Sequence, residues 1–386
     1  MASGVFSRDS VNTSLPTSSF GTASRDSELL KRPRAAADDI PGQAAFIRLL
    51  MNLKVPILEK GSNYRAGQGQ VFVGGGSSYN VSQSLFSLED QHPDRVDIDQ
   101  NTLRSKKYVA KRIIPLPSHI AGDRIQLAAI TNEVRILANE TLKKLPHIVK
   151  LICAAWDEEP TWGRHWPRLL IEAADYGNLA EFMAGHDDSR KWEVKVELLL
   201  DIGGGLNVLH NHQVAHCDLK LENVLVFRSE EGREPPSRVK YQAKLCDFGF
   251  SVIMSDYKPK STYSAILGTK PWNAPELAFG TPIDIELLPM ADVYSLALLF
   301  SRVLMHGGNP FEGLDEDDIR RLKQDPTPMV VSKKVISSIF ERLNYPELLQ
   351  LLIERFLLVS LNNKPEERLP LRFLGMQLLF MGLFQL

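Results

Sequence analysis

The stretch His216–Val226, which reads HCDLKLENVLV, places three polar side chains at fixed offsets between two apolar segments. These side chains are Asp218, Lys220 and Asn223; a helical pattern precedes them and a strand-like run follows. A loop held between packed elements can aim a carboxylate, an ammonium group and a carboxamide at one point. Phosphoryl transfer needs such a set. Asp218 is expected to accept the proton of an attacking hydroxyl, Lys220 to lie against the moving phosphoryl charge, and the Asn223 carbonyl to bind a magnesium ion.

A second magnesium ligand is expected at Asp247, which heads the triplet Asp-Phe-Gly in AKLCDFGFS. Magnesium prefers hard oxygen ligands, so Asn223 and Asp247 form a suitable pair. Such a triplet arises by chance elsewhere, but here it follows the segment just described. In this order the two motifs resemble the catalytic loop, H-R-D-L-x-x-x-N, and the D-F-G motif of eukaryotic-type protein kinases. The D-x-K-x-x-N form is similar to that of the serine/threonine class, with Cys217 where Arg is usual.

The resemblance implies an α+β, two-lobed protein kinase-like fold over residues 55–386. A small antiparallel sheet with one main helix is expected at about 55–174, and a larger, mainly helical lobe at about 175–386. Residues 1–40 are rich in Ser, Thr, Asp and Arg and have few large apolar groups, which predicts a disordered arm. The stretch AAFIRLLMNL, residues 44–53, has helical apolar spacing and is expected to pack on the outside of the domain.

The segment 55–75, VPILEKGSNYRAGQGQVFVGG, is expected to form a strand, a glycine-rich turn and a second strand. Glycine lets backbone N–H groups approach phosphates closely, and the resemblance places nucleotide contacts at Gly67, Gly69 and Val71. In the kinase pattern G-x-G-x-x-G-x-V only the last glycine, Gly69, matches, and a purely structural hairpin is the alternative. The polar residues 74–106 are expected to be an insertion between the second and third strands.

Lys111 lies in the strand-like run KYVAKRII, where VAK is one residue tighter than the family's V-A-I-K. A lysine on a strand is usually a solvated charge; the alternative is an inward-pointing lysine that binds the α- and β-phosphates. That position needs a counter-ion, and Glu133, in the helical stretch 123–142, offers one. The other interpretation of Glu133 is a solvated helix face. Ala110 is expected beside the nucleotide.

Further roles follow from the resemblance alone. It implies a gatekeeper at Ile171, a hinge at 172–174 whose backbone pairs with adenine, a contact at Leu225, and a threonine, Thr269, bonded to the catalytic-loop aspartate and lysine. The expected catalytic residues are thus Asp218, Lys220, Asn223, Lys111, Glu133, Asp247 and Thr269. The expected ATP contacts are Gly67, Gly69, Val71, Ala110, Lys111, Ile171, Glu172, Ala174, Leu225 and Asp247, with Mg²⁺ on Asn223 and Asp247.

The resemblance also implies supporting contacts in the helical lobe. Glu276 of the A-P-E triplet is expected to pair with Arg368, about ninety positions later, although two unrelated surface charges are the alternative. Asp292, near the start of an almost wholly apolar helix, is expected to cap the catalytic-loop backbone. His216 is expected to pack in an apolar stack with Leu137, Leu151 and Phe248, and not to act as a base.

Composition indicates a globular protein of 386 residues, 44% hydrophobic and 24% charged, with a formal net charge of −2. Without a strong positive charge, a nucleic-acid partner is not expected. The three cysteines show no C-x-x-C spacing, which is typical of reduced thiols in an intracellular protein, cytoplasmic or nuclear. No apolar run reaches the ~18 residues of a membrane span, and the apolar residues 371–386 are expected to form a final packed helix.

Three functions are consistent with these patterns. The first is an ATP- and magnesium-dependent kinase acting on Ser/Thr hydroxyls of protein substrates. The second, favoured by the poor glycine match, is a nucleotide-binding or scaffold pseudokinase with little turnover. The third, a small-molecule phosphotransferase, shares the H-x-D core but gives no reason for D-L-K-x-x-N, A-P-E and Asp292 together.

Cys217 predicts a regulatory property. In kinases with Arg at this position, the guanidinium pairs with a phosphorylated activation segment. A thiol offers no such cation, so phosphorylation of Ser261, Thr262 or Ser264 is expected to be unnecessary for activity.

Overall fold

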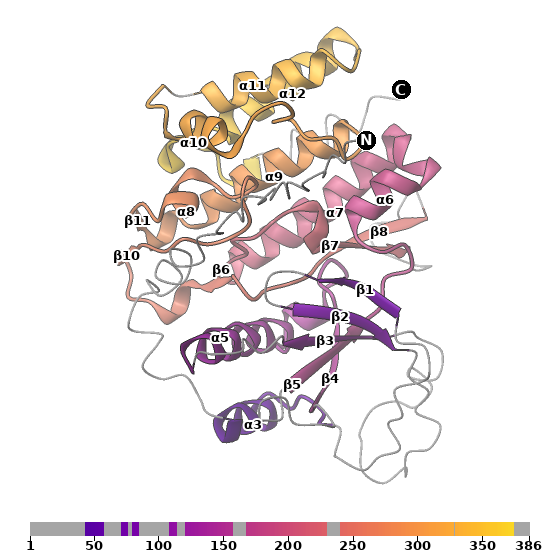
Figure 1. Ribbon diagram of the computed structural model, residues 1–386, viewed down its shortest axis with the longest axis vertical. Coiled ribbons are helices and arrows are strands. Elements are labelled where there is room, and N and C mark those ends of the chain that lie inside the picture. The colour runs from indigo at the N-terminus through magenta and orange to yellow at the C-terminus, as the bar shows by residue number, and fades with distance from the viewer. Residues whose placement is uncertain are drawn as a thin grey trace, which may run out of the picture.

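The computed structural model describes residues 43–57, 71–75, 79–84, 108–113, 120–156, 167–229, 240–327 and 329–373. Figure 1 shows a sheet with two helices in one half of the molecule and a mainly helical second half, which confirms the expected two-lobed α+β architecture. The helices are α3 (Gln43–Asn52), α5 (Ile120–Leu137), α6 (Leu179–Gly185), α7 (Trp192–Asn211), α8 (Pro275–Phe279), α9 (Pro289–Leu304), α10 (Glu316–Gln324), α11 (Val330–Phe340) and α12 (Glu347–Ser360). The strands are β1 (Val71–Gly75), β2 (Tyr79–Ser84), β3 (Tyr108–Ile113), β4 (Leu151–Trp156), β5 (Pro167–Glu172), β6 (Val214–Ala215), β7 (Val224–Arg228), β8 (Tyr241–Leu245), β9 (Val252–Ile253), β10 (Thr262–Tyr263) and β11 (Ile283–Asp284).

The five strands of the small lobe form one antiparallel sheet in the order β1-β2-β3-β5-β4. In its register Val109 lies opposite Ile171, and Lys111 lies opposite Leu169. Directly opposed residues share a face of an antiparallel pair, and side chains alternate between faces along each strand. Lys111 and Val109 therefore share one face of the sheet, and Ala110 lies on the other.

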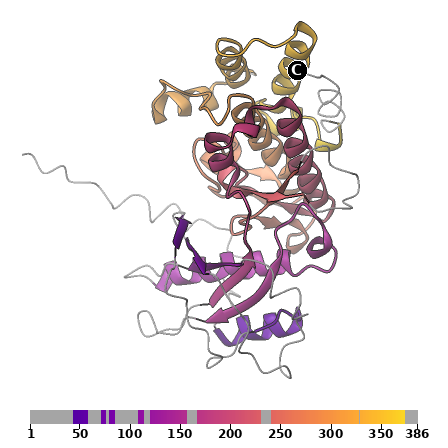
Figure 2. The same cartoon turned by 90° about the vertical axis from the view of Figure 1, so that its right-hand side faces the viewer.

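The predicted helix 44–53 is confirmed as α3, which Figures 1 and 2 place at the end of the small lobe farthest from the helical lobe. Phe46 and Leu50 are fully buried in a cluster that includes Ile130 and Val134 of α5. After α3 the chain follows the outer edge of β4, where Ala154 donates its backbone N–H to the Pro56 carbonyl at 2.9 Å. The segment before the glycine-rich stretch thus covers the edge of β4.

Of the strand, turn and strand predicted at 55–75, the second strand is present as β1, and residues 58–70 lie outside the described residues. Among the described residues, 55–57 bridge to β4, and β1 pairs with β2. The predicted insertion 74–106 was correspondingly too long, because β2 lies within it and pairs with β3. The predicted arm 1–40 and the stretch 58–70, with Gly67 and Gly69, lie outside the described residues.

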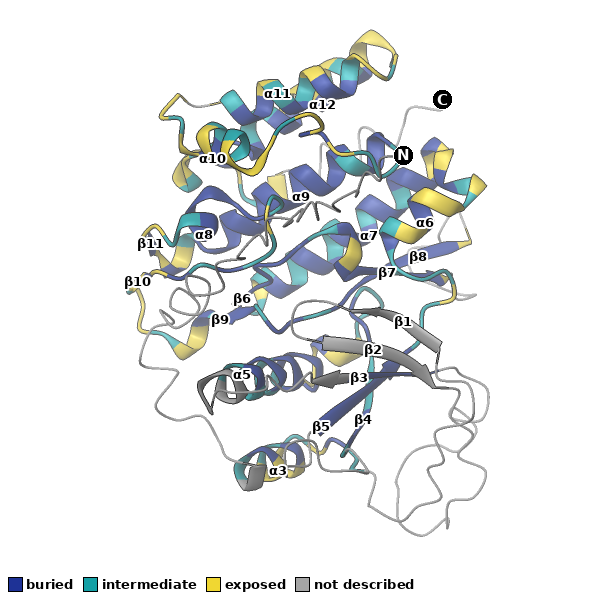
Figure 3. Cartoon of the chain, in the orientation of Figure 1, coloured by how far each residue is buried: buried dark blue, intermediate teal, exposed yellow. Residues whose placement is uncertain are grey.

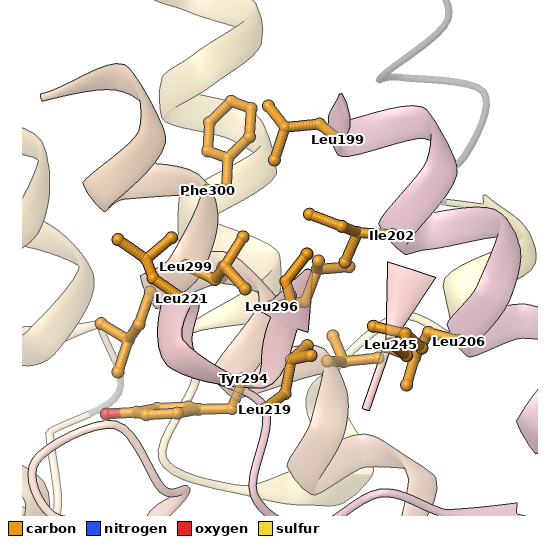
Figure 4. Close-up of a cluster of buried hydrophobic side chains, with 14 of the residues drawn as sticks. Leu199, Ile202, Leu206, Leu219, Leu221, Leu245, Tyr294, Leu296, Leu299 and Phe300 are labelled. Carbon is orange, nitrogen blue, oxygen red and sulfur yellow. The ribbon is translucent and has the colours of Figure 1, made fainter. Parts of the chain in front are cut away.

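The core of the helical lobe is built around α9, in which every residue except Arg302 is buried (Figure 3). Figure 4 shows Leu199, Ile202 and Leu206 of α7 facing Leu296, Leu299 and Phe300 of α9. Leu219 and Leu221 of the loop 216–223 lie in the same buried cluster, so that loop rests directly on the core. Within the described residues, the stretch Ile285–Leu304 is long and apolar enough to span a membrane, but it is 89% buried inside this lobe and gives no clear span.

Candidate active site

One buried carboxylate, that of Asp292, holds the backbone of the loop 216–223 in place. Asp292, near the start of α9, accepts the backbone N–H groups of His216 and Cys217, each at 2.7 Å, and its Oδ2 lies 2.9 Å from Nε2 of His210. The predicted cap is therefore present. Cys217 has a positive φ of 62°, a conformation that non-glycine residues adopt at a cost of about 1–3 kcal/mol. The two bonds from Asp292 hold the loop in this conformation.

Three polar side chains meet above this cap. Asn223 Nδ2 donates to the backbone carbonyl of Asp218 at 2.8 Å and to its carboxylate Oδ2 at 2.9 Å, and Lys220 Nζ lies 3.1 Å from the same oxygen. Lys220 also donates to Thr269 Oγ1 at 2.6 Å. Thr269 therefore contacts the lysine as expected. The expected bond between Thr269 and Asp218 does not occur among the described residues.

A second cluster joins the sheet to the helical lobe. Lys111 Nζ lies 2.8 and 3.0 Å from the two carboxylate oxygens of Glu133, and 2.8 Å from Oδ1 of Asp247. The predicted pairing of Lys111 with Glu133 is present, and Glu133 is buried instead of lying on a solvated helix face. Burial raises the pKa of Glu133 despite the nearby ammonium. Burial also acts to raise the pKa of Asp247, but Lys111 outweighs it and holds that pKa below its usual value.

The residues at the junction of the two clusters fit a divalent cation with oxygen ligands. Asn223 uses its amide nitrogen for both bonds to Asp218, which leaves the carbonyl oxygen as the side-chain acceptor. Cys246, the neighbour of Asp247, donates its backbone N–H to the backbone carbonyl of Asn223 at 3.1 Å. The segments that carry the two ligands are therefore hydrogen-bonded to each other through their main chains. A carboxylate and an amide oxygen are ligands that magnesium accepts, with water and phosphate oxygens in the remaining positions.

Two long-range contacts predicted from the sequence support the same lobe. Arg368 donates to both carboxylate oxygens of Glu276, at 2.6 and 2.9 Å, in a buried bidentate pair. The rings of His216 and Phe248 lie 5.2 Å apart, both are fully buried, and Leu137 and Leu151 pack in the same cluster. His216 is therefore a packing residue whose Nε2 also lies 3.2 Å from the Cys246 carbonyl.

Comparison with known proteins shows which family has this order of motifs. A family model described as "Protein kinase domain" matches residues 100–374, which is more than half of the chain. The chain belongs to the protein kinase family. It is 27% identical over 197 residues to the probable serine/threonine-protein kinase kinY of Dictyostelium discoideum, covering 48% of this chain and 32% of that protein.

Other relatives differ in kind. The chain is 31% identical over 138 residues to human dual specificity testis-specific protein kinase 2, covering 35% of this chain and 21% of that protein. It is 28% identical over 150 residues to rat atrial natriuretic peptide receptor 2, covering 38% of this chain and 13% of that protein. The chain thus spans a third or less of the length of these curated relatives.

The predicted hinge, 172–174, begins at the last residue of β5. The Glu172 side chain is turned away from solvent: it lies 2.9 Å from Lys244 Nζ, and it accepts the backbone N–H of Lys150 at 2.9 Å. The next two residues are alanines, so the backbone is what 172–174 can offer to a base. Recognition of adenine by these main-chain groups stays a prediction.

One predicted nucleotide contact, Ala110, requires a correction. Val109 and Ile171 belong to one apolar cluster, and the partly buried Leu225 packs against it. Ala110, which the sequence pattern placed at the nucleotide, lies on the opposite face of β3 from Lys111 and is therefore not part of this cluster. The shortened V-A-K spacing pointed to the wrong residue, because side chains two positions apart share a face of a strand and adjacent ones do not. Val109 is the residue that sequence reasoning missed.

The β1–β2 hairpin also suggests a different glycine alignment. Residues 74–81 read GGGSSYNV, so the pattern G-x-G-x-x-G-x-V falls on Gly74, Gly76, Tyr79 and Val81, with Tyr79 in place of the third glycine. Gly74 and Gly75 end β1, and Tyr79 begins β2, so the pattern spans the end of one strand and the start of the next. This alignment matches two glycines where the alignment on Gly69 matched one.

The activation segment, expected at 251–267, and the residues just before it contact α5 and the helical lobe at several points. Asn132 donates to the carbonyls of Phe248 and Ser251, at 3.2 and 2.6 Å. Arg135 makes a bidentate pair with Asp256 at 2.6 and 2.7 Å, on partly exposed side chains. Strand β9 pairs with β6 and β10 pairs with β11. The segment is therefore held by carboxylate, amide and backbone contacts.

The three cysteines are buried thiols. Burial raises the pKa of Cys153 to about 12 and that of Cys217 well above its usual value, and in Cys217 the charges of Asp292 and Asp218 add to the effect. Cys217 therefore stays a neutral thiol and supplies neither a nucleophile nor a cation.

Proposed function

We propose that this protein is an ATP- and Mg²⁺-dependent protein kinase that transfers the γ-phosphoryl group to serine or threonine hydroxyls of protein substrates. The observation that carries the proposal is the contact of Lys111 with both Glu133 and Asp247. This contact brings a phosphate-binding cation, from the sheet, next to a metal-binding carboxylate, from the helical lobe. Both groups are required together for transfer in kinases.

Each side chain near the reaction has one task in this proposal. Asp218 accepts the proton of the acceptor hydroxyl, and the bonds from Asn223 and Lys220 orient its carboxylate for that step. Lys220, bonded to Thr269, lies against the charge of the phosphoryl group as it moves. Lys111 binds the α- and β-phosphates. Asn223 and Asp247 hold the metal ion, which when bound neutralises phosphate charge.

The nucleotide base is placed between the lobes by backbone and apolar groups. The main chain of 172–174 pairs with adenine, and Val109, Ile171 and Leu225 supply the apolar wall. The main chain of Gly74 and Gly75, at the end of β1, lies over the phosphates. An intracellular site of action fits this use of ATP and the three reduced, buried thiols.

The choice of serine and threonine rests on Lys220 in the D-x-K-x-x-N form of the loop and on relatives named as serine/threonine kinases. One relative is named a dual specificity kinase, so tyrosine peptides belong in the same test. The assay is transfer of labelled phosphate to generic protein and peptide acceptors at saturating ATP and Mg²⁺. Transfer that does not exceed that of an Asp218→Asn variant would end the proposal.

A second function is favoured by one observation. Tyr79 stands where the pattern has its third glycine, and a side chain there weakens the case for tight nucleotide binding. The alternative is a pseudokinase that acts as a binding or scaffold protein. It predicts that Mg²⁺–ATP leaves the thermal unfolding midpoint unchanged, or raises it without turnover, and the same assay separates it from the active enzyme.

A further inference from the structure

The segment 268–273 lies directly against the catalytic loop. A Cβ atom added at Gly268 would come within 2.5 Å of the Cys217 carbonyl oxygen and 3.5 Å of Asp218 Oδ1, so this backbone touches the loop that carries the base. Gly268 also has a φ of 80°, which favours glycine. The next residue, Thr269, is bonded to Lys220. The segment 268–273 therefore borders the carboxylate that an acceptor hydroxyl has to reach.

The backbone of that segment is held by a buried lysine from a distant helix. Lys323, near the end of α10, is 4% exposed, and its Nζ donates to the carbonyls of Pro271 and Asn273 at 2.6 and 2.5 Å. Among the described residues, no carboxylate forms an ion pair with this ammonium group. The rest of α10 behaves differently, since Arg320 and Arg321 are solvent-exposed and pair with Asp317 and Asp318.

Burial of an ammonium group without a counter-ion is unfavourable, and an apolar side chain of similar length would fill the same space without that cost. What the ammonium group adds is two directed bonds to main-chain carbonyls that flank Trp272. Desolvation lowers the pKa of Lys323 to about 7, against the opposing effect of Glu276 and with the help of Arg368 and Lys270. The neutral amine keeps its N–H donors, so the bonds persist on either side of that value.

The side chain between those two carbonyls is held as well. The guanidinium of Arg302 lies 4.3 Å from the centre of the Trp272 ring, and Arg302 also pairs with Glu222 of the catalytic loop at 3.3 Å. On its other side Trp272 contacts the ring of Phe311, 6.5 Å away. Residues 271–273 are thus fixed through their backbone by Lys323 and through Trp272 by Arg302.

We propose that Lys323 is a positioning residue for the acceptor substrate: it fixes the backbone of 271–273, against which the acceptor polypeptide is placed next to Asp218. The proposal rests on the proposed kinase function and concerns the acceptor side of the reaction alone. ATP is bound between the lobes, away from α10. Loss of the two bonds therefore raises the KM for the acceptor and leaves the KM for ATP unchanged.

The experiment compares Lys323→Met and Lys323→Gln with wild type in the full chain, and Lys333→Met on the exposed face of α11 is the matched control. With a generic peptide acceptor, we expect Lys323→Met to raise the peptide KM about tenfold with less than a twofold change in the KM for ATP. Lys323→Gln keeps an N–H donor, so its peptide KM is expected to lie between those of wild type and Lys323→Met. An unchanged peptide KM, or equal increases in both KM values, would overturn the proposal.

A second measurement does not need turnover. Amide hydrogen exchange of the peptide covering 268–275 is expected to become several-fold faster in both Lys323 variants, with exchange of α5 unchanged. Equal exchange of that peptide in wild type and in both variants refutes the role of Lys323. Absence of phosphate transfer by wild type refutes the proposed function instead, and the exchange result then still decides whether Lys323 orders the segment.

Discussion

The two sides of the proposed nucleotide site are built in different ways. On the side of the helical lobe, Asp218, Lys220 and Asn223 form a network of bonds of 2.6–3.1 Å with each other and with Thr269. On the side of the small lobe, the described residues bring two polar side chains to the site, Lys111 of β3 and its partner Glu133 of α5. The other proposed nucleotide contacts on that side are backbone and apolar groups, such as Val109 and the main chain that ends β1.

The difference separates two functions that kinases combine. The groups that act on the proton and the metal ion depend on side chains whose geometry is fixed by many partners. The groups that cover the nucleotide depend on shape and on close approach of the backbone. A side chain such as that of Tyr79, at the third glycine position, is expected to change the affinity for ATP and not the chemical step. Variants on the helical side should therefore change turnover, and variants on the sheet side should change nucleotide binding.

The largest effect is expected from Asp218→Asn. Loss of a general base typically lowers turnover by about 10²–10⁴-fold, and the amide keeps the shape of the side chain, so the ATP-induced rise in thermal midpoint is expected to persist. Phosphate transfer and thermal unfolding measure the two outcomes, with Asp317→Asn on exposed α10 as control. If turnover survives in Asp218→Asn, the helical side of the comparison is misassigned.

A stability effect is expected from Lys111→Met, which leaves Glu133 and Asp247 close together without their cation. Removal of one partner from a buried ion pair destabilises by about 3–5 kcal/mol. In wild type Lys111 lowers the pKa of Asp247; without it, burial raises the pKa of both carboxylates above their unfolded values. The folded variant then binds more protons than the unfolded chain, so its stability falls as pH rises from 5 to 7.5.

Urea unfolding of Lys111→Met at pH 5 and pH 7.5 tests this prediction. The exposed Lys143, paired with Glu140 on the surface, provides the control variant Lys143→Met. A midpoint that shifts with pH in parallel with wild type would show that the two carboxylates do not depend on Lys111.

A smaller effect, on the sheet side, is expected from Tyr79→Gly. It restores the third glycine of the pattern at the start of β2, and we expect the KM for ATP to fall about three- to tenfold, equivalent to roughly 1 kcal/mol of binding. Turnover at saturating ATP should not change. Tyr79→Phe serves as control. A weaker affinity for ATP in Tyr79→Gly would reject the alignment on Gly74 and Gly76.

The smallest effect concerns the activation segment, which is attached to α5 through the pair between Arg135 and Asp256. Phosphatase treatment is expected to leave turnover unchanged, because Cys217 supplies no cation for a phosphorylated Ser261, Thr262 or Ser264. Arg135→Gln is expected to reduce turnover only two- to fivefold, since exposed pairs contribute about 0.2–1 kcal/mol. Activity that disappears after phosphatase treatment contradicts the prediction.

The sequence predicted best what depends on local spacing. The offsets of Asp218, Lys220 and Asn223 are set within one loop, and Asp292 and Arg368 could be placed because the order of motifs was intact. The glycine pattern was aligned on Gly69 because two glycine-rich stretches compete, at 61–69 and 74–76. The pairing of β2 with β3 favours the second stretch, and the sequence alone does not show that pairing. Val109 was missed because the shortened V-A-K spacing pointed to the adjacent Ala110, whereas side chains two positions apart share a face.

Other contacts left no local signal. Lys323 lies in EDDIRRLKQ, a polar helical sequence in which a lysine is expected in solvent. Its burial depends on the backbone of 271–273, about fifty positions earlier. The pair between Arg135 and Asp256 likewise joins a helix of one lobe to a loop of the other, and charges so far apart in sequence carry no mutual pattern.

The docking of Pro56 beside Ala154 has a practical consequence for dissecting the chain. Residues 43–57 precede the match to the kinase family, which begins at residue 100, yet they cover the outer edge of β4 and bury Phe46 beside Trp156. A fragment trimmed to the family boundaries would also lack β1 and β2, which opens the edge of β3, and it would leave the edge of β4 open next to an uncovered apolar face. Such edges recruit strands from other molecules, so the trimmed fragment is expected to self-associate more strongly than the full chain.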